Sequence, residues 1–268
     1  MFEPLKKMFS GKASRKRASM PAGERAYVIG DIHGRFDLFE ELIKAIEEDD
    51  LASAEANTTM ILLGDLIDRG PDSAGVIRLA RLWEEYRQIR YLTGNHEEMF
   101  LESFDDKDVL RHFLKHGGRE TVLSYGIDKK QFNKSTLEEL QQWMHANVPQ
   151  ADLDFLSGFE DMIEMGDYLF VHAGINPTKP LEEQKPRELR WIRDPFLKHK
   201  DKYSHIVVHG HTITQDVDSR KNRIGIDTGA YRFGRLTALV LEGDTQRYIQ
   251  AVEKKNGKIK IVKKDESA

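Results

Sequence analysis

Aspartate, asparagine and histidine recur in this chain where an apolar run gives way to glycine, as in YVIGDIHG, ILLGDLIDRG and YLTGNHE. Two later apolar runs end in VHAG and VVHGHT. These motifs supply Asp31, His33, Asp65, Asp68, Asn95, His96, His172, His209 and His211. Carboxylate oxygen, amide oxygen and imidazole nitrogen are ligands for hard and borderline divalent cations. Two aspartates, one asparagine and three histidines from such motifs are too many for one small ion, and they suit two ions that share a carboxylate.

The composition excludes several other kinds of chemistry. The chain has 268 residues and no cysteine, which excludes disulfides, thiolate zinc sites and cysteine nucleophiles. The formal net charge of −4 gives no reason to expect general nucleic-acid binding. No apolar run is long enough to cross a bilayer, and the basic N-terminus lacks the apolar core of a signal peptide. We therefore expect a cytoplasmic protein without a transmembrane segment.

The elements that position the motifs follow from the spacing of apolar residues. Short apolar runs alternate with segments whose apolar residues recur at helical spacing. The expected strands are 25–30, 58–64 and 89–94, and the expected helices are 37–50, 73–86 and 96–104. This alternation predicts an α/β fold with a parallel sheet, in which ligands bind beyond the carboxyl ends of the strands.

The pattern changes in the second half of the chain. Helical segments with polar breaks predict a helical cap inserted at about 104–160. Strands dominate afterwards, beginning with a hairpin that turns at Gly166 and Asp167. We expect these later strands to form a second, largely antiparallel sheet.

The expected domain boundaries follow from this order. Residues 1–24 are predicted to be a basic flexible tail, with contact to acidic lipid or RNA as the alternative. The main domain is expected at 25–251. Residues 252–268 are expected to hold the last strand and a charged C-terminal end.

Isolated histidines are expected to lie on the surface or in a satisfied core, without a direct chemical role. They are His112, His116, His145, His199 and His205. His209 lies beside His211, and we expect it to support the site or simply to end its strand rather than to bind a metal. Asp227 is expected to form a turn or to pair with a ligand histidine, and Tyr231 and Arg232 are candidates for contact with the substrate.

The motifs GDIHG, GDLIDRG and GNHE, in this order and with VHAG and HGHT after them, resemble those of a known family. They are similar to the metallophosphoesterases of the phosphoprotein phosphatase family, which includes calcineurin and bacteriophage lambda protein phosphatase. The resemblance covers about residues 26–241 and is weakest in the helical insert. It implies a two-sheet α/β/β/α sandwich with a helical cap, of the bacterial serine/threonine phosphatase type.

The resemblance implies two divalent metal ions at six positions. Asp65 would bridge both ions. The remaining ligands would be Asp31 and His33 for the first ion, and Asn95, His172 and His211 for the second. Mn²⁺ is the expected ion, with Fe, Zn, Co and Ni as alternatives, because mixed nitrogen and oxygen sites accept all of them.

The resemblance also implies an acid and two phosphate-binding arginines. His96 would act as the general acid, oriented by Asp68, and Arg69 would hold phosphate oxygens. Arg193 is expected to be the second arginine, with Arg190 as the alternative. A hydroxide between two cations ~3.5–4 Å apart would attack phosphorus directly. The arginines would offset the developing charge, and His96 would protonate the leaving oxygen.

One position narrows the substrate class. Many nuclease-like members end in Gly-His-x-His, and Ile213 stands here in place of the second histidine. Together with the Asp-Arg-Gly and Asn-His-Glu forms of the motifs, this favours the phosphoprotein phosphatase branch, and the resemblance to this branch implies phosphoserine and phosphothreonine in proteins as substrates, and phosphotyrosine in addition. The alternative is hydrolysis of dinucleoside polyphosphates, such as diadenosine tetraphosphate, or of RNA caps. A catalytically inactive scaffold is a remote alternative, because every expected ligand position is filled and His96 and Arg69 are both present.

Overall fold

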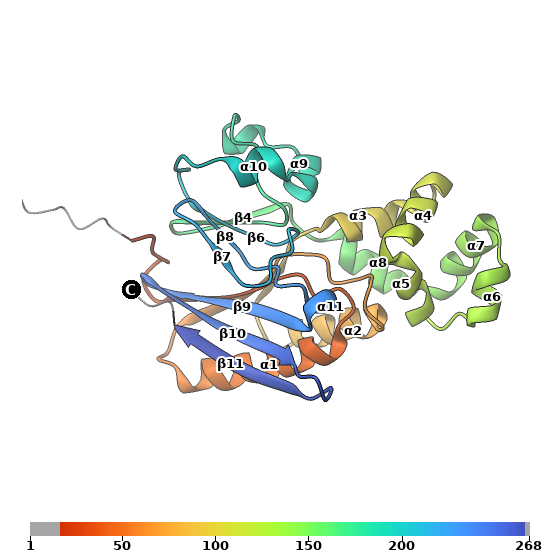
Figure 1. Cartoon of the computed structure of the whole chain (residues 1–268), viewed down its shortest axis with the longest axis horizontal. Coiled ribbons are helices and arrows are strands. Elements are labelled where there is room, and N and C mark those ends of the chain that lie inside the picture. Colours follow the sequence, from red (N-terminus) through yellow and green to blue (C-terminus); the bar gives the residue numbers. More distant parts are fainter. Residues whose placement is uncertain (1–16, 266–268) are drawn as a thin grey trace, which may run out of the picture.

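Two β-sheets stack face to face, and helices cover the outer face of each sheet (Figure 1). The structure is a computed structural model that describes residues 17–265. The four layers form the α/β/β/α sandwich that the sequence predicts, which confirms the fold class. Within the described residues, no helix is both long enough and apolar enough to cross a membrane.

The first sheet has the strand order β11-β10-β9-β1-β2-β3. Its strands are β1 (Glu24–Ile29), β2 (Asn57–Leu62), β3 (Ile89–Tyr91), β9 (Arg235–Glu242), β10 (Thr245–Glu253) and β11 (Ile259–Asp265). Strands β1, β2 and β3 pair in parallel, whereas β9 pairs antiparallel to β1. The carboxyl ends of the three parallel strands therefore meet at one edge of the sheet.

The second sheet has the strand order β4-β5-β6-β8-β7. Its strands are β4 (Met162–Met165), β5 (Tyr168–Val171), β6 (Ile206–His209), β7 (Asp218–Ser219) and β8 (Arg223–Gly225). The hairpin predicted at Gly166 and Asp167 is confirmed, since β4 and β5 pair antiparallel around it.

The expectation of a largely antiparallel second sheet is wrong. Strands β5, β6 and β8 pair in parallel, and the late strands β9 to β11 join the first sheet instead. The pattern of apolar residues along the sequence identifies strands, but it does not specify which sheet each strand joins. The parallel pairing brings the ends of β5 and β6 to one edge, as in the first sheet.

The alternation of side chains along each strand divides the core into layers. On β1, Tyr27 and Ile29 pack toward the helices, whereas Ala26 and Val28 pack between the sheets with Phe170 of β5. Helices α1 (Phe36–Ala52) and α2 (Ser73–Glu84) cover the first sheet. The second sheet is covered by η3 (Leu181–Glu183), α9 (Pro186–Trp191) and α10 (Asp194–Lys198).

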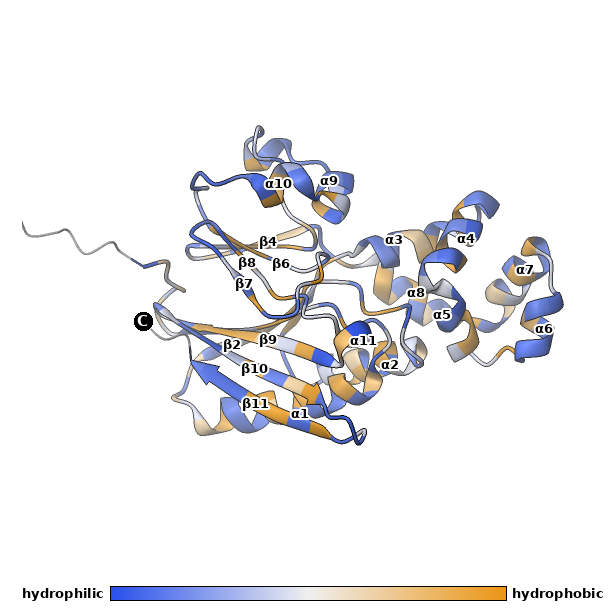
Figure 2. Cartoon of the chain, in the orientation of Figure 1, coloured by the Kyte–Doolittle hydropathy of each residue, from blue (hydrophilic) through white to orange (hydrophobic). Residues whose placement is uncertain are grey.

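A helical insert follows α3 (Asn95–Glu102) and projects from one side of the sandwich (Figure 1). It comprises α4 (Lys107–Phe113), the π-helical turn η2 (Leu114–Gly118), α5 (Arg119–Ser124), α6 (Lys129–Lys134), α7 (Leu137–Asn147) and α8 (Gln150–Ser157). Apolar and polar residues alternate along these helices (Figure 2). Their buried side chains, such as Phe113 and Met144, belong to the same apolar core as those of α1 and α2.

The described part of the predicted tail packs against the domain. Ser19 donates its backbone N–H to Asp167 Oδ2 at 2.9 Å, and Met20 is buried between the two sheets. Residues 1–16 and 266–268 lie outside the described residues, so most of the predicted tail and the last residues of the charged end have no structural description.

Candidate active site

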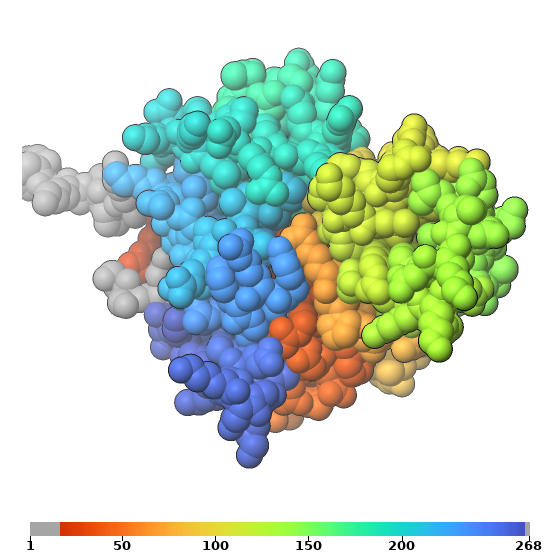
Figure 3. Space-filling view, turned by 45° about the vertical axis from the view of Figure 1, so that its right-hand side comes forward, coloured from red at the N-terminus to blue at the C-terminus, as the bar shows by residue number. Residues whose placement is uncertain are grey.

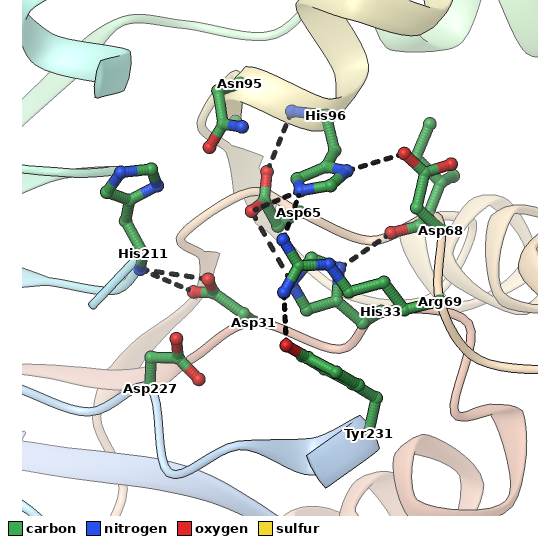
Figure 4. A network of polar contacts seen from close by, with 12 residues as sticks. Asp31, His33, Asp65, Asp68, Arg69, Asn95, His96, His211, Asp227 and Tyr231 are labelled. Atoms are coloured by element: carbon green, nitrogen blue, oxygen red, sulfur yellow. Dashed lines mark hydrogen bonds and ion pairs between the residues drawn. The ribbon is translucent and has the colours of Figure 1, made fainter. Parts of the chain in front are cut away.

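The predicted site residues lie at the carboxyl ends of strands from both sheets. Asp31 and His33 follow β1, Asp65 follows β2, and Asn95 begins α3 a few residues after β3. His172 directly follows β5 in the second sheet, and His211 lies two residues after β6. Figure 4 shows these loops converging on Asp65. Residues that lie far apart in the sequence are thus brought together by two parallel strand edges.

Strained backbone is concentrated at this centre. Among the described residues, the non-glycine residues with positive φ are all predicted site residues: His33, Asp65, Asp68, Arg69 and His211. Their φ values lie between 49° and 74°. Such conformations cost roughly 1–3 kcal/mol each and persist where the surrounding structure enforces them, commonly at functional sites.

Asp65 lies at the centre of two groups of possible metal ligands. Its Oδ2 is 3.6 Å from His33 Nε2, and its Oδ1 is 3.5 Å from His172 Nε2. His33, Asp65 and His96 form one buried cluster, and Asp65, His172 and His211 form the other. A single carboxylate therefore belongs to both clusters, as a bridging ligand requires.

Hydrogen bonds hold two imidazoles in the form that binds metal. His33 Nδ1 donates to the backbone oxygen of Ile67 at 2.9 Å, and His172 Nδ1 donates to that of Leu63 at 2.7 Å. These bonds place the proton on Nδ1, so each Nε2 carries a lone pair that is directed at the centre. His211 Nε2 is buried without any hydrogen-bond partner. Such a buried nitrogen fits a site that takes a cation.

The contact between Asn95 and His172 also indicates a cation site. Asn95 Oδ1 lies 3.1 Å from His172 Nε2, and with Nδ1 protonated both atoms are acceptors. Two facing acceptors repel, and a cation bound by both relieves the repulsion. The donor set of carboxylate, amide and imidazole suits a divalent ion.

Burial and charge also match a cation site. Burial lowers the pKa of His33 to about 3 and that of His211 to about 2, so both imidazoles are neutral at pH 7, as ligands must be. Burial, together with the nearby Asp227 and Asp65, raises the pKa of Asp31 well above its usual value. A bound cation would offset this buried negative charge.

Asp68 and His96 form a buried pair beside the centre. His96 Nδ1 lies 2.5 Å from Asp68 Oδ2, and the backbone N–H of His96 donates to Asp65 Oδ1 at 3.1 Å. Burial alone would lower the pKa of His96, but Asp65 and Asp68 outweigh it and raise the pKa. Nε2 on the other side of the ring faces the pocket, where it can give a proton to a leaving group.

Arg69 reaches over the centre from the loop after β2. Its Nη2 lies 3.0 Å from His96 Nε2, and its Nη1 donates to the hydroxyl of Tyr231. The guanidinium also stacks on the Tyr231 ring, with Cζ 4.7 Å from the ring centre. Tyr231 follows Ala230, the first residue of α11 (Ala230–Phe233). Tyr231 thus holds Arg69, a role that the sequence analysis did not assign.

A pocket of about 460 Å³ opens above the centre. Figure 3 shows the yellow-green insert, the teal segment of α9 and α10 and the blue segment that ends in α11 meeting across this face of the molecule. Arg193 is exposed and lines the pocket. Arg190 instead forms ion pairs with Asp161 and Glu98, at 2.7 and 2.8 Å. The geometry therefore favours Arg193 over Arg190 for contact with phosphate.

Two histidines of the insert also line this pocket, although their isolated positions in the sequence gave no sign of it. His112 and His116 lie one helical turn apart, and their ring centres are 4.0 Å apart. Both are exposed, as expected for isolated histidines. Only the fold of the insert reveals that they face the pocket.

Glu97 braces the loops that carry the site. Its carboxylate accepts the backbone N–H groups of Asp65, Leu66 and Gly94 at 2.8, 2.8 and 3.0 Å. Gly94 allows this close approach, because a Cβ there would lie 2.1 Å from Asp65 Oδ1. Burial, with the nearby charge of Asp65, raises the pKa of Glu97 to about 7.

His209 and Asp227 lie just outside the two clusters. His209 Nδ1 donates to the backbone oxygen of Gly210 at 3.0 Å, and its Nε2 accepts from Arg223 at 3.2 Å. Both ring nitrogens are thus used within the protein. Asp227 Oδ1 accepts the backbone N–H of Gly229 at 3.0 Å, as a turn former does, while Oδ2 is buried without a partner.

The stacked sheets and the shared aspartate define a metallophosphoesterase. The family model described as calcineurin-like phosphoesterase matches residues 24–242, and the chain belongs to this family. It is accordingly a hydrolase that acts on phosphoric esters.

Relatives of this chain carry two different activities in their names. Bis(5'-nucleosyl)-tetraphosphatase PrpE of Anoxybacillus flavithermus is 26% identical over 79% of this chain and 88% of its own. Serine/threonine-protein phosphatase 2 of Escherichia coli is 27% identical over 79% of this chain and 90% of its own. The crystal structure of a candidate diadenosine tetraphosphatase superposes with a TM-score of 0.58 at 21% identity, over 93% of this chain and all of the other. This last likeness supports the fold.

Proposed function

We propose that this protein is a two-metal phosphatase that removes phosphate from phosphoserine and phosphothreonine in cytoplasmic proteins, and from phosphotyrosine in addition. One observation carries the proposal: His96, which is bound to the buried Asp68, lines the same pocket as Arg69 and the shared carboxylate of Asp65. An acid, a phosphate-binding cation and a metal centre are the parts that hydrolysis of a phosphomonoester needs.

Six residues around Asp65 would hold the metals, and His96, although it belongs to one of the two clusters, would stay free as the acid. Asp65 would contact both ions, and the other ligands would be Asp31, His33, Asn95, His172 and His211. When bound, Mn²⁺ or a similar ion supplies Lewis acidity toward the phosphoryl oxygens and lowers the pKa of water.

The chain's own side chains then act on the substrate. Arg69 and Arg193 bind the phosphoryl oxygens and orient phosphorus for attack by water from the side opposite the leaving group. His96 gives a proton to the leaving oxygen of the seryl or threonyl side chain. Asp68 accepts from Nδ1 and favours the doubly protonated imidazolium, so that Nε2 carries the proton that goes to that oxygen.

The test compares three substrates with the Mn²⁺-loaded protein: a phosphoserine peptide, a phosphotyrosine peptide and diadenosine tetraphosphate. We expect the highest kcat/KM for the phosphoserine peptide. We also expect His96→Asn to lower kcat by about 10²–10⁴-fold while the metal content stays the same, because a general acid contributes about that factor. Full activity in the His96→Asn variant would refute the acid assignment.

Hydrolysis of dinucleoside polyphosphates or RNA caps is the second candidate. The pocket is lined by a third arginine, Arg232, and by Trp191 in addition to Arg69 and Arg193. Extra positive charge suits a chain of phosphates, and an indole suits stacking with a base. The relatives named bis(5'-nucleosyl)-tetraphosphatase support it as well. A higher kcat/KM for diadenosine tetraphosphate than for either peptide would decide for this candidate.

A catalytically inactive scaffold fits the site poorly. Every expected ligand position carries a residue able to bind a metal, four of these residues belong to the two clusters around Asp65, and His96 and Arg69 are both present. Absence of turnover on all three substrates, with both metals bound, would establish the scaffold instead.

A further inference from the structure

The helical insert reaches back to the loop that carries Asp68 and Arg69. Thr121 of α5 lies 53 residues after Asp68, and both side chains are completely buried. Gly117 of η2 contacts Arg69. Two residues of the proposed machinery are therefore held by a segment that lies outside both sheets.

Both oxygens of the Asp68 carboxylate have a fixed partner. Oδ2 accepts from His96 Nδ1 at 2.5 Å, and Oδ1 accepts from Thr121 Oγ1 at 2.5 Å. Because a carboxylate is planar, a partner on each oxygen fixes the direction in which Oδ2 meets the imidazole. The hydroxyl of Thr121 thereby sets the orientation of His96 through Asp68.

The hydroxyl of Thr121 is itself held from two sides. Its oxygen lies 2.9 Å from the backbone nitrogen of Asp68 and 2.9 Å from Ser73 Oγ. Since the Thr121 O–H donates to the carboxylate, its oxygen accepts from the backbone N–H and from Ser73. The network is buried, and the backbone N–H of Asp68 also lies 2.9 Å from Ser73 Oγ. Loss of the Thr121 hydroxyl therefore removes the group that holds Asp68 Oδ1, while the backbone N–H keeps Ser73 as an acceptor.

The insert also holds strained backbone at Arg69. Asp68 and Arg69 have φ values of 74° and 69°. The backbone N–H of Arg69 donates to the carbonyl of Gly117 at 3.1 Å. Gly117 has a φ of 117°, and a Cβ there would lie 2.5 Å from Arg69 Cγ, so glycine is required for this approach. Asp68 and Arg69 thus both depend on contacts with the insert.

We propose that Thr121 is a positioning residue for the general acid, so that the insert is part of the catalytic apparatus as well as a wall of the pocket. The inference rests on the proposed function, because it takes His96 as the proton donor. In that reaction water adds to phosphorus, the bond from phosphorus to the leaving oxygen breaks, and the proton of His96 goes to that oxygen.

The choice of leaving group separates positioning from mere packing. Phenyl phosphate releases a basic phenolate, which needs a proton as it leaves. 4-Nitrophenyl phosphate releases a stabilised phenolate, which needs little help. A poorly aimed acid therefore slows hydrolysis of the first ester more than that of the second, whereas damage to the metal centre slows both.

The experiment measures kcat of the Mn²⁺-loaded Thr121→Val variant with both esters. Because a general acid contributes about 10²–10⁴-fold, we expect kcat for phenyl phosphate to fall at least about tenfold and that for 4-nitrophenyl phosphate no more than about threefold. Thr121→Ser keeps the hydroxyl and should restore the ratio of the two rates. Equal losses with both esters, or no loss with either, would overturn the proposal.

A second threonine of the insert provides the control. Thr136 caps α7 and accepts the backbone N–H of Glu139. Thr136→Val weakens the insert away from Asp68 and should leave the ratio of the two rates unchanged. In Thr121→Val a methyl group takes the place of the hydroxyl. If that variant does not fold, Thr121→Ala removes the hydroxyl without adding a methyl group, and it should show the same selective loss.

A spectroscopic measurement separates this proposal from the proposed function. In the protein loaded with diamagnetic Zn²⁺, the proton shared by His96 Nδ1 and Asp68 should give a strongly downfield proton NMR resonance, and loss of the Thr121 hydroxyl should move it. If the parent protein hydrolyses neither ester, the proposed function fails, and the resonance still tests the positioning. A resonance unchanged in both Thr121→Val and Thr121→Ala would overturn the role of Thr121.

Discussion

Asp31 accepts the backbone N–H of His211 with both carboxylate oxygens, at 3.2 and 2.9 Å, although 180 residues separate them. Asp31 follows β1 of the first sheet, and His211 lies just after β6 of the second. The contact joins the two sheets at the edge where the clusters lie. One carboxylate thus links the sheets and is also a candidate ligand, so metal binding and the stability of this edge are coupled.

Metal affinity should depend on pH through Asp31. Its raised pKa means that a proton competes with the metal, so binding releases this proton. The affinity for Mn²⁺ should therefore fall as the pH falls, by about tenfold per pH unit for each proton released. Calorimetric titration with Mn²⁺ at pH 7.5 and pH 6.0 measures the affinity. Repeating it in two buffers of different ionisation enthalpy measures the number of protons released on binding. Affinity that is constant over this range would contradict the prediction.

Arg193→Ala and Arg190→Ala should have different effects. Arg193 is exposed in the pocket, so its loss should lower kcat/KM by about tenfold or more, since a hydrogen bond to a charged group contributes about 1.5–3 kcal/mol. Arg190 is bound to Asp161 and Glu98, so its loss should lower Tm and affect kcat/KM less. Each variant serves as the control for the other. The opposite pattern would make Arg190 the phosphate ligand.

Tyr231→Phe should weaken the hold on Arg69. The ring remains for stacking, but the hydroxyl that accepts from Nη1 is lost. We expect KM for a phosphopeptide to rise about three- to tenfold, which corresponds to about 1 kcal/mol for a hydrogen bond. Metal content should not change. Tyr86→Phe, at an exposed position, is the control, and an equal KM in the two variants would refute the role of Tyr231.

Glu97→Gln should destabilise the protein. The amide group of glutamine would place a donor against backbone N–H groups that now meet carboxylate oxygens. We expect the free energy of unfolding to fall by about 1–3 kcal/mol, the cost of a buried donor without an acceptor. Urea denaturation measures it, with the exposed Glu85→Gln as control. A denaturation midpoint equal to that of the control would show that Glu97 does not stabilise these loops.

The sequence was most informative where strand and ligand are adjacent in the chain. Asp31, Asp65 and Asn95 each follow an apolar run, so the strand edge and the polar side chain could be predicted together. The parallel pairing of β1, β2 and β3 then required that these side chains meet. The same reasoning placed His172 and His211, since each follows a short apolar strand.

Contacts between distant segments could not be predicted in this way. Thr121 is an ordinary helical threonine in the sequence, and only the fold of the insert places it against Asp68. His112 and His116 look like isolated surface histidines, and they are exposed, but the insert turns them toward the pocket. Strands β9 to β11 were expected in the wrong sheet, because an apolar run does not specify its neighbour.

The insert leaves and rejoins the sandwich at nearly the same place. Its far end returns beside β3, where Glu160 donates its N–H to the carbonyl of Tyr91 and accepts from the N–H of Thr93. A segment with adjoining ends is easily exchanged or lengthened without disturbing the scaffold that carries it. If the cap of a relative is grafted onto this scaffold, the hybrid therefore keeps an effective general acid only under one chemical condition. The transplanted segment must bring a hydroxyl to Asp68, or the hybrid will bind metal and phosphate but protonate its leaving group poorly.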